Sequence, residues 1–230
     1  MYDLRLQSSR ADVSGATGSM AYEVMDACDG WAVRQRLSMT ITNQDGQDSE
    51  MVSDYTTWES KDGTKLRFRM RQSTDRKVTS DVEGDASLEG PGQGGTVHYT
   101  TPEETTKKLP PGTLFPMAHT AAILTAAEAG KRFAAIPLFD GTTANGAQDS
   151  FITVTKWEGP QQSKWPALSK LPSGRVHVAF FDRDGSAQTP DYEVGMRYWE
   201  NGVADDLSMD FGDFVMDGKL TEFRLLPRGC

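Results

Sequence analysis

Alternation of apolar and polar residues with a period of two is the feature that most constrains how this chain can fold. In residues 31–42, large apolar side chains take most odd positions, whereas arginine, serine and threonine take most even ones. Residues 66–71 repeat the pattern, with arginine at every odd position. Such alternation gives a β-strand one buried face and one wet face. Short polar turns at residues 43–46 and 61–63 separate these segments, so the pattern predicts an antiparallel meander.

Further strand-like segments occur along most of the chain. They are residues 2–6, 51–58, 96–99, 151–157, 175–181, 192–200, 203–211, 214–216 and 220–226. The Asn201-Gly202 pair is the strongest hairpin signal, because this dipeptide suits a two-residue turn with positive φ angles.

One segment, residues 117–129, is typical of a helix because it is rich in alanine and has no internal glycine or proline. Pro116 can open this helix, Gly130 stands where a C-terminal cap belongs, and Thr113 is a candidate cap donor. The face expected to pack on the sheet carries Met117, Ala121 and Leu124.

A sheet with one apolar face must curl on itself or pack on a helix. We therefore expect a mainly β protein, in which one curled antiparallel sheet forms a broken barrel with a single main α-helix packed against it. The chain shows neither an internal repeat nor a clean linker, so we expect residues 1–230 to form a single domain.

Charge and hydropathy narrow the classes of function. The chain has 33 acidic and 24 basic residues, and its net charge of −9 argues against a nucleic-acid binder and against electrostatic adhesion to an anionic membrane. It has no run of eighteen apolar residues, so we expect no membrane-spanning helix. Met1 stands directly before a strand-like segment, which favours a chain from which a secretory signal has been removed.

The two cysteines, Cys28 and Cys230, allow two interpretations. In a reducing compartment they are unrelated thiols, whereas in an oxidising one they can form a disulfide that ties the end of the chain to its start. Their spacing does not decide between these interpretations. The absence of a Cys-x-x-Cys motif argues against redox catalysis and against a four-cysteine zinc site.

Few residues point to chemistry. Of three histidines, His119 on the expected helix is the best binding candidate, although a histidine hydrogen-bonded between helix and sheet is the simpler interpretation. We find no Gly-x-Ser-x-Gly nucleophile motif. Two aspartate pairs do not continue into a calcium loop, so we expect no metal site, no cofactor and no catalytic residue. The pairs are Asp205-Asp206 and Asp182 with Asp184.

A basic stripe stands out on this acidic chain. Arg67, Arg69 and Arg71 share one face of a predicted strand. They can bind phosphate or carboxylate groups of envelope components, or they can form a solvated face paired with acids on neighbouring strands.

Several short segments, taken together and in order, resemble the EipB envelope-integrity family, a periplasmic family of unknown function in Gram-negative bacteria. They are residues 2–6, 28–31, 54–59, 114–116 with His119, 126–130, 139–141, 201–203, and 226–227 with Cys230. The resemblance implies a periplasmic protein folded as a broken, spiral-like β-barrel, similar in outline to lipoprotein carriers. It also implies a Cys28–Cys230 disulfide and a role in maintaining the cell envelope, and it provides no catalytic residues.

Three functional hypotheses remain. The first is a non-enzymatic periplasmic protein that supports envelope integrity by binding an envelope component or a protein partner. The second is a carrier or sensor of a lipid-like ligand, and the third is a hydrolase of envelope polymers. A deep apolar cavity favours the carrier, a packed interior with an exposed apolar patch favours the partner-binding protein, and a cleft joining a histidine to a carboxylate favours the enzyme.

Overall fold

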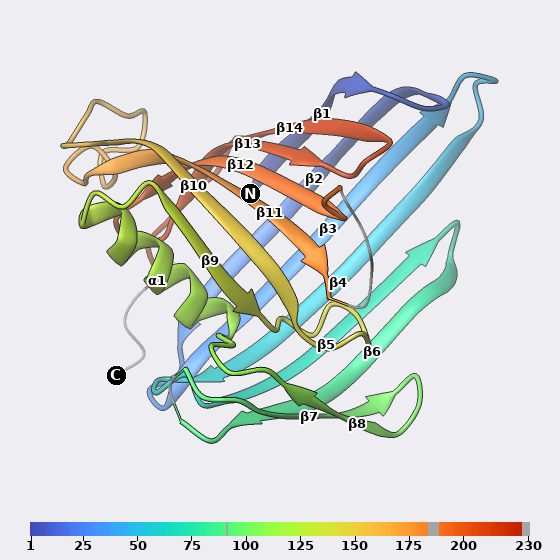
Figure 1. The fold of residues 1–230 in the computed structure, drawn as a ribbon. Coiled ribbons are helices and arrows are strands. Elements are labelled where there is room, and N and C mark those ends of the chain that lie inside the picture. Colours follow the sequence, from blue (N-terminus) through green and yellow to red (C-terminus); the bar gives the residue numbers. More distant parts are fainter. Residues whose placement is uncertain (91, 184–188, 227–230) are drawn as a thin grey trace.

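A computed structural model describes residues 1–90, 92–183 and 189–226. Within these residues, fourteen strands form one antiparallel sheet accompanied by one α-helix, so the predicted mainly β fold is confirmed (Figure 1). The elements are β1 (Tyr2–Ser9), β2 (Val13–Asp26), β3 (Gly30–Asn43), β4 (Asp48–Ser60), β5 (Lys65–Thr74), β6 (Lys77–Leu88), β7 (Gly95–Thr101), β8 (Thr105–Leu109), α1 (Pro116–Glu128), β9 (Phe133–Leu138), β10 (Gln148–Glu158), β11 (Ser173–Asp182), β12 (Tyr192–Trp199), β13 (Ala204–Asp210) and β14 (Phe214–Leu220).

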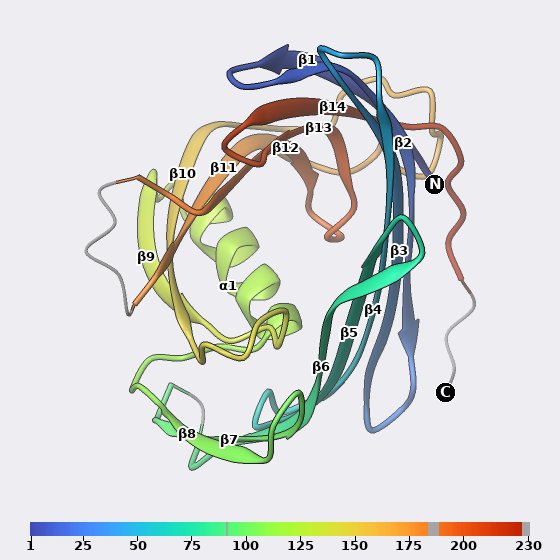
Figure 2. The ribbon, with the colours of Figure 1, turned by 90° about the vertical axis from the view of Figure 1, so that its right-hand side faces the viewer.

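The sheet consists of two meanders joined through the ends of the chain. Its order is β8-β7-β6-β5-β4-β3-β2-β1-β14-β13-β12-β11-β10-β9, so β1 pairs with β14 in the middle. The sheet curls around α1, as Figure 2 shows, but β8 and β9 remain its two edges. Leu114 lies in the connection between β8 and α1, and a parallel bridge joins it to Leu138 at the end of β9. The result is a broken barrel with a concave side that holds the helix and a convex side that faces outward.

The helix packs on β9 to β12 through a row that differs in part from the predicted one. Its buried residues are His119, Ile123, Leu124 and Ala127. The prediction was right for Leu124 and wrong for Ala121, which is exposed. The cause is the placement of His119, Ile123 and Ala127, a row at intervals of four residues, against the sheet. Gly130 has a φ of 71° and ends the helix as predicted.

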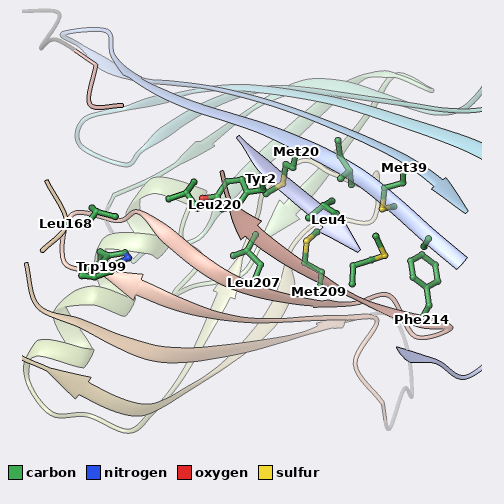
Figure 3. Packing of buried hydrophobic residues seen from close by; sticks show 13 residues of the cluster. Tyr2, Leu4, Met20, Met39, Leu168, Trp199, Leu207, Met209, Phe214 and Leu220 are labelled. Atoms are coloured by element: carbon green, nitrogen blue, oxygen red, sulfur yellow. The ribbon is translucent and has the colours of Figure 1, made fainter. Parts of the chain in front are cut away.

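Buried residues form three hydrophobic clusters on the concave side. The largest joins the two halves of the chain across β1 and β14; Figure 3 shows it around Tyr2, Leu4, Met20, Met39, Leu207, Met209 and Phe214. The second lies near the open seam, by which we mean the gap between the edge strands β8 and β9. It contains the aromatic residues Phe68, Tyr99, Phe115 and Phe139. The third joins α1 to β10, β11 and β12.

The strand predicted over residues 220–226 is wrong. β14 ends at Leu220, because Leu220 pairs with Tyr2, the first residue of the neighbouring strand. Beyond this point β14 has no partner strand on that side. Strands β2, β6, β8 and β9 were not predicted.

Candidate functional site

His119 is a buried link between the helix and the sheet. It is 5% exposed, and its Nε2 lies 2.8 Å from the Ser150 Oγ. The Ser150 hydroxyl donates its own proton to the Ile136 carbonyl at 2.6 Å. The imidazole Nε2 must therefore carry a proton and donate it to Ser150. Burial lowers the pKa of His119 to about 4, so the ring is neutral at pH 7.

This geometry differs from that of a nucleophile activated by a histidine. In such a site the histidine accepts the serine proton and a carboxylate orients the ring. Here the serine proton goes to a backbone carbonyl. Among the described residues, no hydrogen bond joins His119 to a carboxylate. The arrangement supports the simpler interpretation, in which His119 ties α1 to β10 and, through Ser150, to β9.

We expect His119→Gln to keep the function of the protein, because the glutamine amide can also donate to Ser150 while it removes acid–base chemistry near neutral pH. The free energy of unfolding should fall by no more than about 1 kcal/mol, the typical contribution of one hydrogen bond, because the glutamine keeps this bond. Denaturant unfolding and rescue of envelope integrity in a strain that lacks the gene test this expectation. A folded variant with complete loss of rescue would instead support an enzyme.

The basic stripe lies on the convex side, opposite the buried Leu66 and Phe68 of the same strand. Arg69 contacts Glu83 at 2.9 Å, and both Arg69 and Arg71 lie within 4.0 Å of Asp81. The Arg67 guanidinium lies 5.5 Å from the centre of the Trp58 ring. The geometry thus favours a solvated face paired with acids of β6. It places these arginines on the face of the sheet opposite to His119, so the predicted binding residues do not form one site.

The aspartates considered for calcium make other contacts. Asp206 pairs with Lys219 at 2.6 Å and with Arg175 at 2.9 Å, and the bond to Lys219 lowers the pKa of this carboxyl. Asp184 lies outside the described residues. In the part of the chain that the structure describes, no group of three or more histidine, cysteine or acidic side chains could hold a metal ion.

Glu59 is a buried carboxylate that sequence reasoning missed. It is 1% exposed and extends from β4 to the first turn of α1. Its Oε2 accepts the Met117 N–H at 2.7 Å, and its Oε1 accepts the Ala118 N–H at 2.8 Å. Burial raises the pKa of Glu59 to about 7, although these two hydrogen bonds oppose the rise.

The sequence contained one signal for a residue such as Glu59, namely a helix whose N-cap position carries no capping side chain. Phe115 takes the N-cap position and makes no capping hydrogen bond with its side chain. Thr113 was predicted as cap donor, but its hydroxyl donates to the Pro110 carbonyl at 2.7 Å. The first N–H groups of a helix need acceptors, so a helix without a capping side chain indicates an acceptor elsewhere in the fold.

The concave side also carries tyrosines that are largely engaged in hydrogen bonds. Tyr55 donates to the Asp140 carbonyl at 2.5 Å, and the Tyr198 hydroxyl lies 3.1 Å from that of Thr120. Tyr22 follows the buried Met20 by two positions, so it points to the same side of the sheet. Its side chain is nevertheless 45% exposed. Tyr22 therefore marks a part of the concave side that solvent reaches.

An apolar surface lies on the convex side beside the β9 edge, and we call its four residues the edge patch. They are Phe133, Ala135, Phe151 and Phe181. Phe133 is 74% exposed and Phe151 is 51% exposed. The rings of Phe151 and Phe181 meet edge to face at 5.4 Å. The alternate residues, such as Ala134 and Ile152, pack toward the helix, which places the edge patch outside.

Two polar hollows lie elsewhere among the described residues. One is formed by residues 162–170. The other contains Arg10, Asp210, His177 and Glu193, which form two pairs with closest distances of 2.7 Å and 3.1 Å. Neither hollow is a deep apolar cavity.

The predicted disulfide stays a prediction. Cys28 lies in the connection between β2 and β3, with a φ of 69°. Cys230 lies outside the described residues.

The sequence pattern of the EipB-like family matches residues 1–227. The chain belongs to the EipB-like family. It is 32% identical over 239 residues to the cell envelope integrity protein EipB of Brucella abortus (strain 2308), covering 100% of this chain and 84% of that relative. The name of this EipB-like relative supports a role in cell-envelope integrity.

The fold comparison agrees with the family. The structure matches the crystal structure of a β-barrel-like protein of a domain of unknown function from Brucella abortus with a TM-score of 0.87. The match has 32% identity and covers 98% of this chain and 96% of the other. No helix among the described residues is long and apolar enough to cross a membrane.

Proposed function

We propose that this EipB-like protein supports cell-envelope integrity as a non-catalytic, periplasmic binding protein that docks a protein partner on the edge patch. The role in envelope integrity rests on the relative from Brucella abortus. The binding role rests on the chemistry of the described residues. The His119 imidazole donates to Ser150 and is not placed to accept its proton.

The contrast between the two sides of the sheet carries the proposal. On the concave side, buried residues form three hydrophobic clusters, one of which includes the helix. On the convex side, Phe133 and Phe151 expose aromatic rings beside an edge strand. Large exposed apolar side chains that gather in one place are typical of interaction sites. This combination favours a partner-binding protein over a carrier with a deep cavity.

Tyr22 favours a second candidate function, the carriage or sensing of a lipid-like ligand. Its side chain is 45% exposed on the concave side, where a ligand could reach it. Residues that line such a ligand site should affect function without a large loss of stability.

Rescue of envelope integrity in a strain that lacks the gene tests both candidates. We expect the double variant Phe133→Ser with Phe151→Ser to fold and to lose rescue. Val78→Ser is the matched control, because Val78 is 49% exposed but lies on β6, away from the edge patch, and we expect this variant to restore integrity fully. Full rescue by the double variant would overturn the proposal. Loss of rescue confined to Tyr22→Trp would favour the carrier.

A further inference from the structure

We propose that the partner binds by strand addition, so that an extended, acidic segment pairs with the free edge of β9 and lays apolar side chains on Phe133 and Phe151. This inference rests on the proposed function and adds how the edge patch recognises its partner. Its support comes from the backbone groups at the free edge of β9 and from the charged residues that precede Phe133.

The directions of the β9 backbone groups follow from three hydrogen bonds. The Arg132 carbonyl accepts the Val154 N–H, so the backbone N–H and C=O groups of the even-numbered residues in β9 are directed toward β10. The Pro137 carbonyl accepts the Leu114 N–H, and the Phe139 N–H donates to the Leu114 carbonyl. The backbone groups of the odd-numbered residues are therefore directed away from β10, toward the free edge.

The same alternation directs the N–H and C=O groups of Phe133 and Ala135 toward the free edge. β9 is the last strand of the sheet, and the residue that bridges to it from this side, Leu114, sits opposite Leu138 at its other end. The first half of β9 thus presents four backbone groups and two exposed side chains to an incoming strand. This is the arrangement that strand-addition sites use, with backbone bonds for affinity and alternate side chains for selectivity.

The two edges of the sheet are protected differently. Proteins discourage pairing at free edges with lysine, proline or bulges. β8 carries Lys107 and Lys108, and the second half of β9 carries Pro137. The first half of β9 has none of these devices, since its residues are phenylalanine and alanine. The unprotected part of the edge coincides with the edge patch.

Charge selects the chemistry of the partner. Lys131 and Arg132 are exposed and directly precede β9, and within the described residues neither forms an ion pair. They are the charged residues nearest in sequence to the first half of β9. Acidic residues in the incoming strand would meet them. A second copy of this chain is a poorer fit, because its own β9, Phe133–Leu138, contains no acid.

Titration of the whole protein with a short synthetic peptide of alternating glutamate and valine tests the proposal. Affinity is measured by calorimetry, and hydrogen exchange is followed by NMR at the Phe133 and Ala135 amides. We expect binding to slow exchange at these two amides. N-methylation of the peptide nitrogens that would face β9 should weaken binding at least about tenfold, because strand addition depends on backbone hydrogen bonds.

Charge variants provide the matched control. Lys131→Glu with Arg132→Glu should weaken binding of the peptide about tenfold at low salt, whereas Lys107→Glu with Lys108→Glu on the other edge should change it less than about twofold. Equal affinity for the methylated peptide, protection located elsewhere, or a protein dimer that Phe133→Ser dissolves would each overturn strand addition. If the peptide fails to bind but Phe133→Ser with Phe151→Ser still loses rescue, the proposed function stands and only this inference falls.

Discussion

Replacing Phe139 with alanine is expected to lower the free energy of unfolding by about 3–5 kcal/mol, the usual cost of removing a buried phenylalanine ring. Phe139 is 0% exposed and follows β9, close to the open seam of the sheet. Its ring meets those of Phe68, Phe115 and Tyr99 edge to face, with centres 5.3 Å, 6.3 Å and 6.3 Å away. These three neighbouring rings are themselves buried, so we expect them to collapse little into the cavity and the loss to lie in the upper part of the usual range.

Phe151→Ala is the matched control, because it removes the same atoms from a ring that is 51% exposed. Its cost should stay below about 1 kcal/mol, in line with surface substitutions. Denaturant unfolding of both variants, with the slope against denaturant checked for two-state behaviour, measures the difference. A loss below about 1 kcal/mol for Phe139→Ala would show that the seam does not depend on this cluster.

Amphipathic strands were predictable from the sequence where each inward position carries a large side chain. Residues 31–42 show this pattern, and they lie in β3 of the structure. The helix was also predictable, because alanine-rich sequence without glycine or proline needs no tertiary partner to indicate helix. Its buried face was harder to predict, since alanines occur all around it and the sheet decides which of them it covers.

Strands β2 and β6 were missed because glycine occupies inward positions. A side chain at Gly18 would begin 2.9 Å from the Met39 side chain and 2.4 Å from the Ser38 carbonyl. A side chain at Gly84 would likewise begin 2.9 Å from the Phe68 ring. Large neighbours on adjacent strands fill these positions, so glycine fits in the middle of a strand. A single sequence does not reveal which strands will be neighbours.

The candidate site shows the same limit. His119 was singled out from the sequence, but its partner Ser150 lies on a strand that comes next to it only in the fold. Glu59 reaches the N-terminus of α1 across 58 positions of sequence. The edge patch was not predicted, because exposure of Phe133 and Phe151 follows from where the sheet ends.

Two buried groups should give opposite pH dependences. Glu59 has an ordinary pKa of 4.5 and a folded pKa of about 7. Between these values the folded state binds more protons than the unfolded state, so its contribution to stability falls as pH rises, by roughly 3 kcal/mol in total. His119 has an ordinary pKa of 6.5 and a folded pKa of about 4. Here the unfolded state binds more protons, so stability rises with pH, again by roughly 3 kcal/mol.

The two contributions therefore nearly cancel between pH 4.5 and pH 6.5, where both groups titrate. In Glu59→Gln only the His119 contribution remains. As pH is raised from 4.5 to 6.5, the free energy of unfolding of this variant should therefore rise by about 2–3 kcal/mol more than that of the parent protein. In His119→Gln only the Glu59 contribution remains, so over the same rise in pH the free energy of unfolding should fall by a similar amount relative to the parent. Other titrating groups are common to all three proteins and drop out of the comparison. Denaturant unfolding at pH 4.5, 5.5 and 6.5, at constant ionic strength, measures the three slopes. Parallel slopes would show that neither buried group titrates differently in the folded and unfolded states.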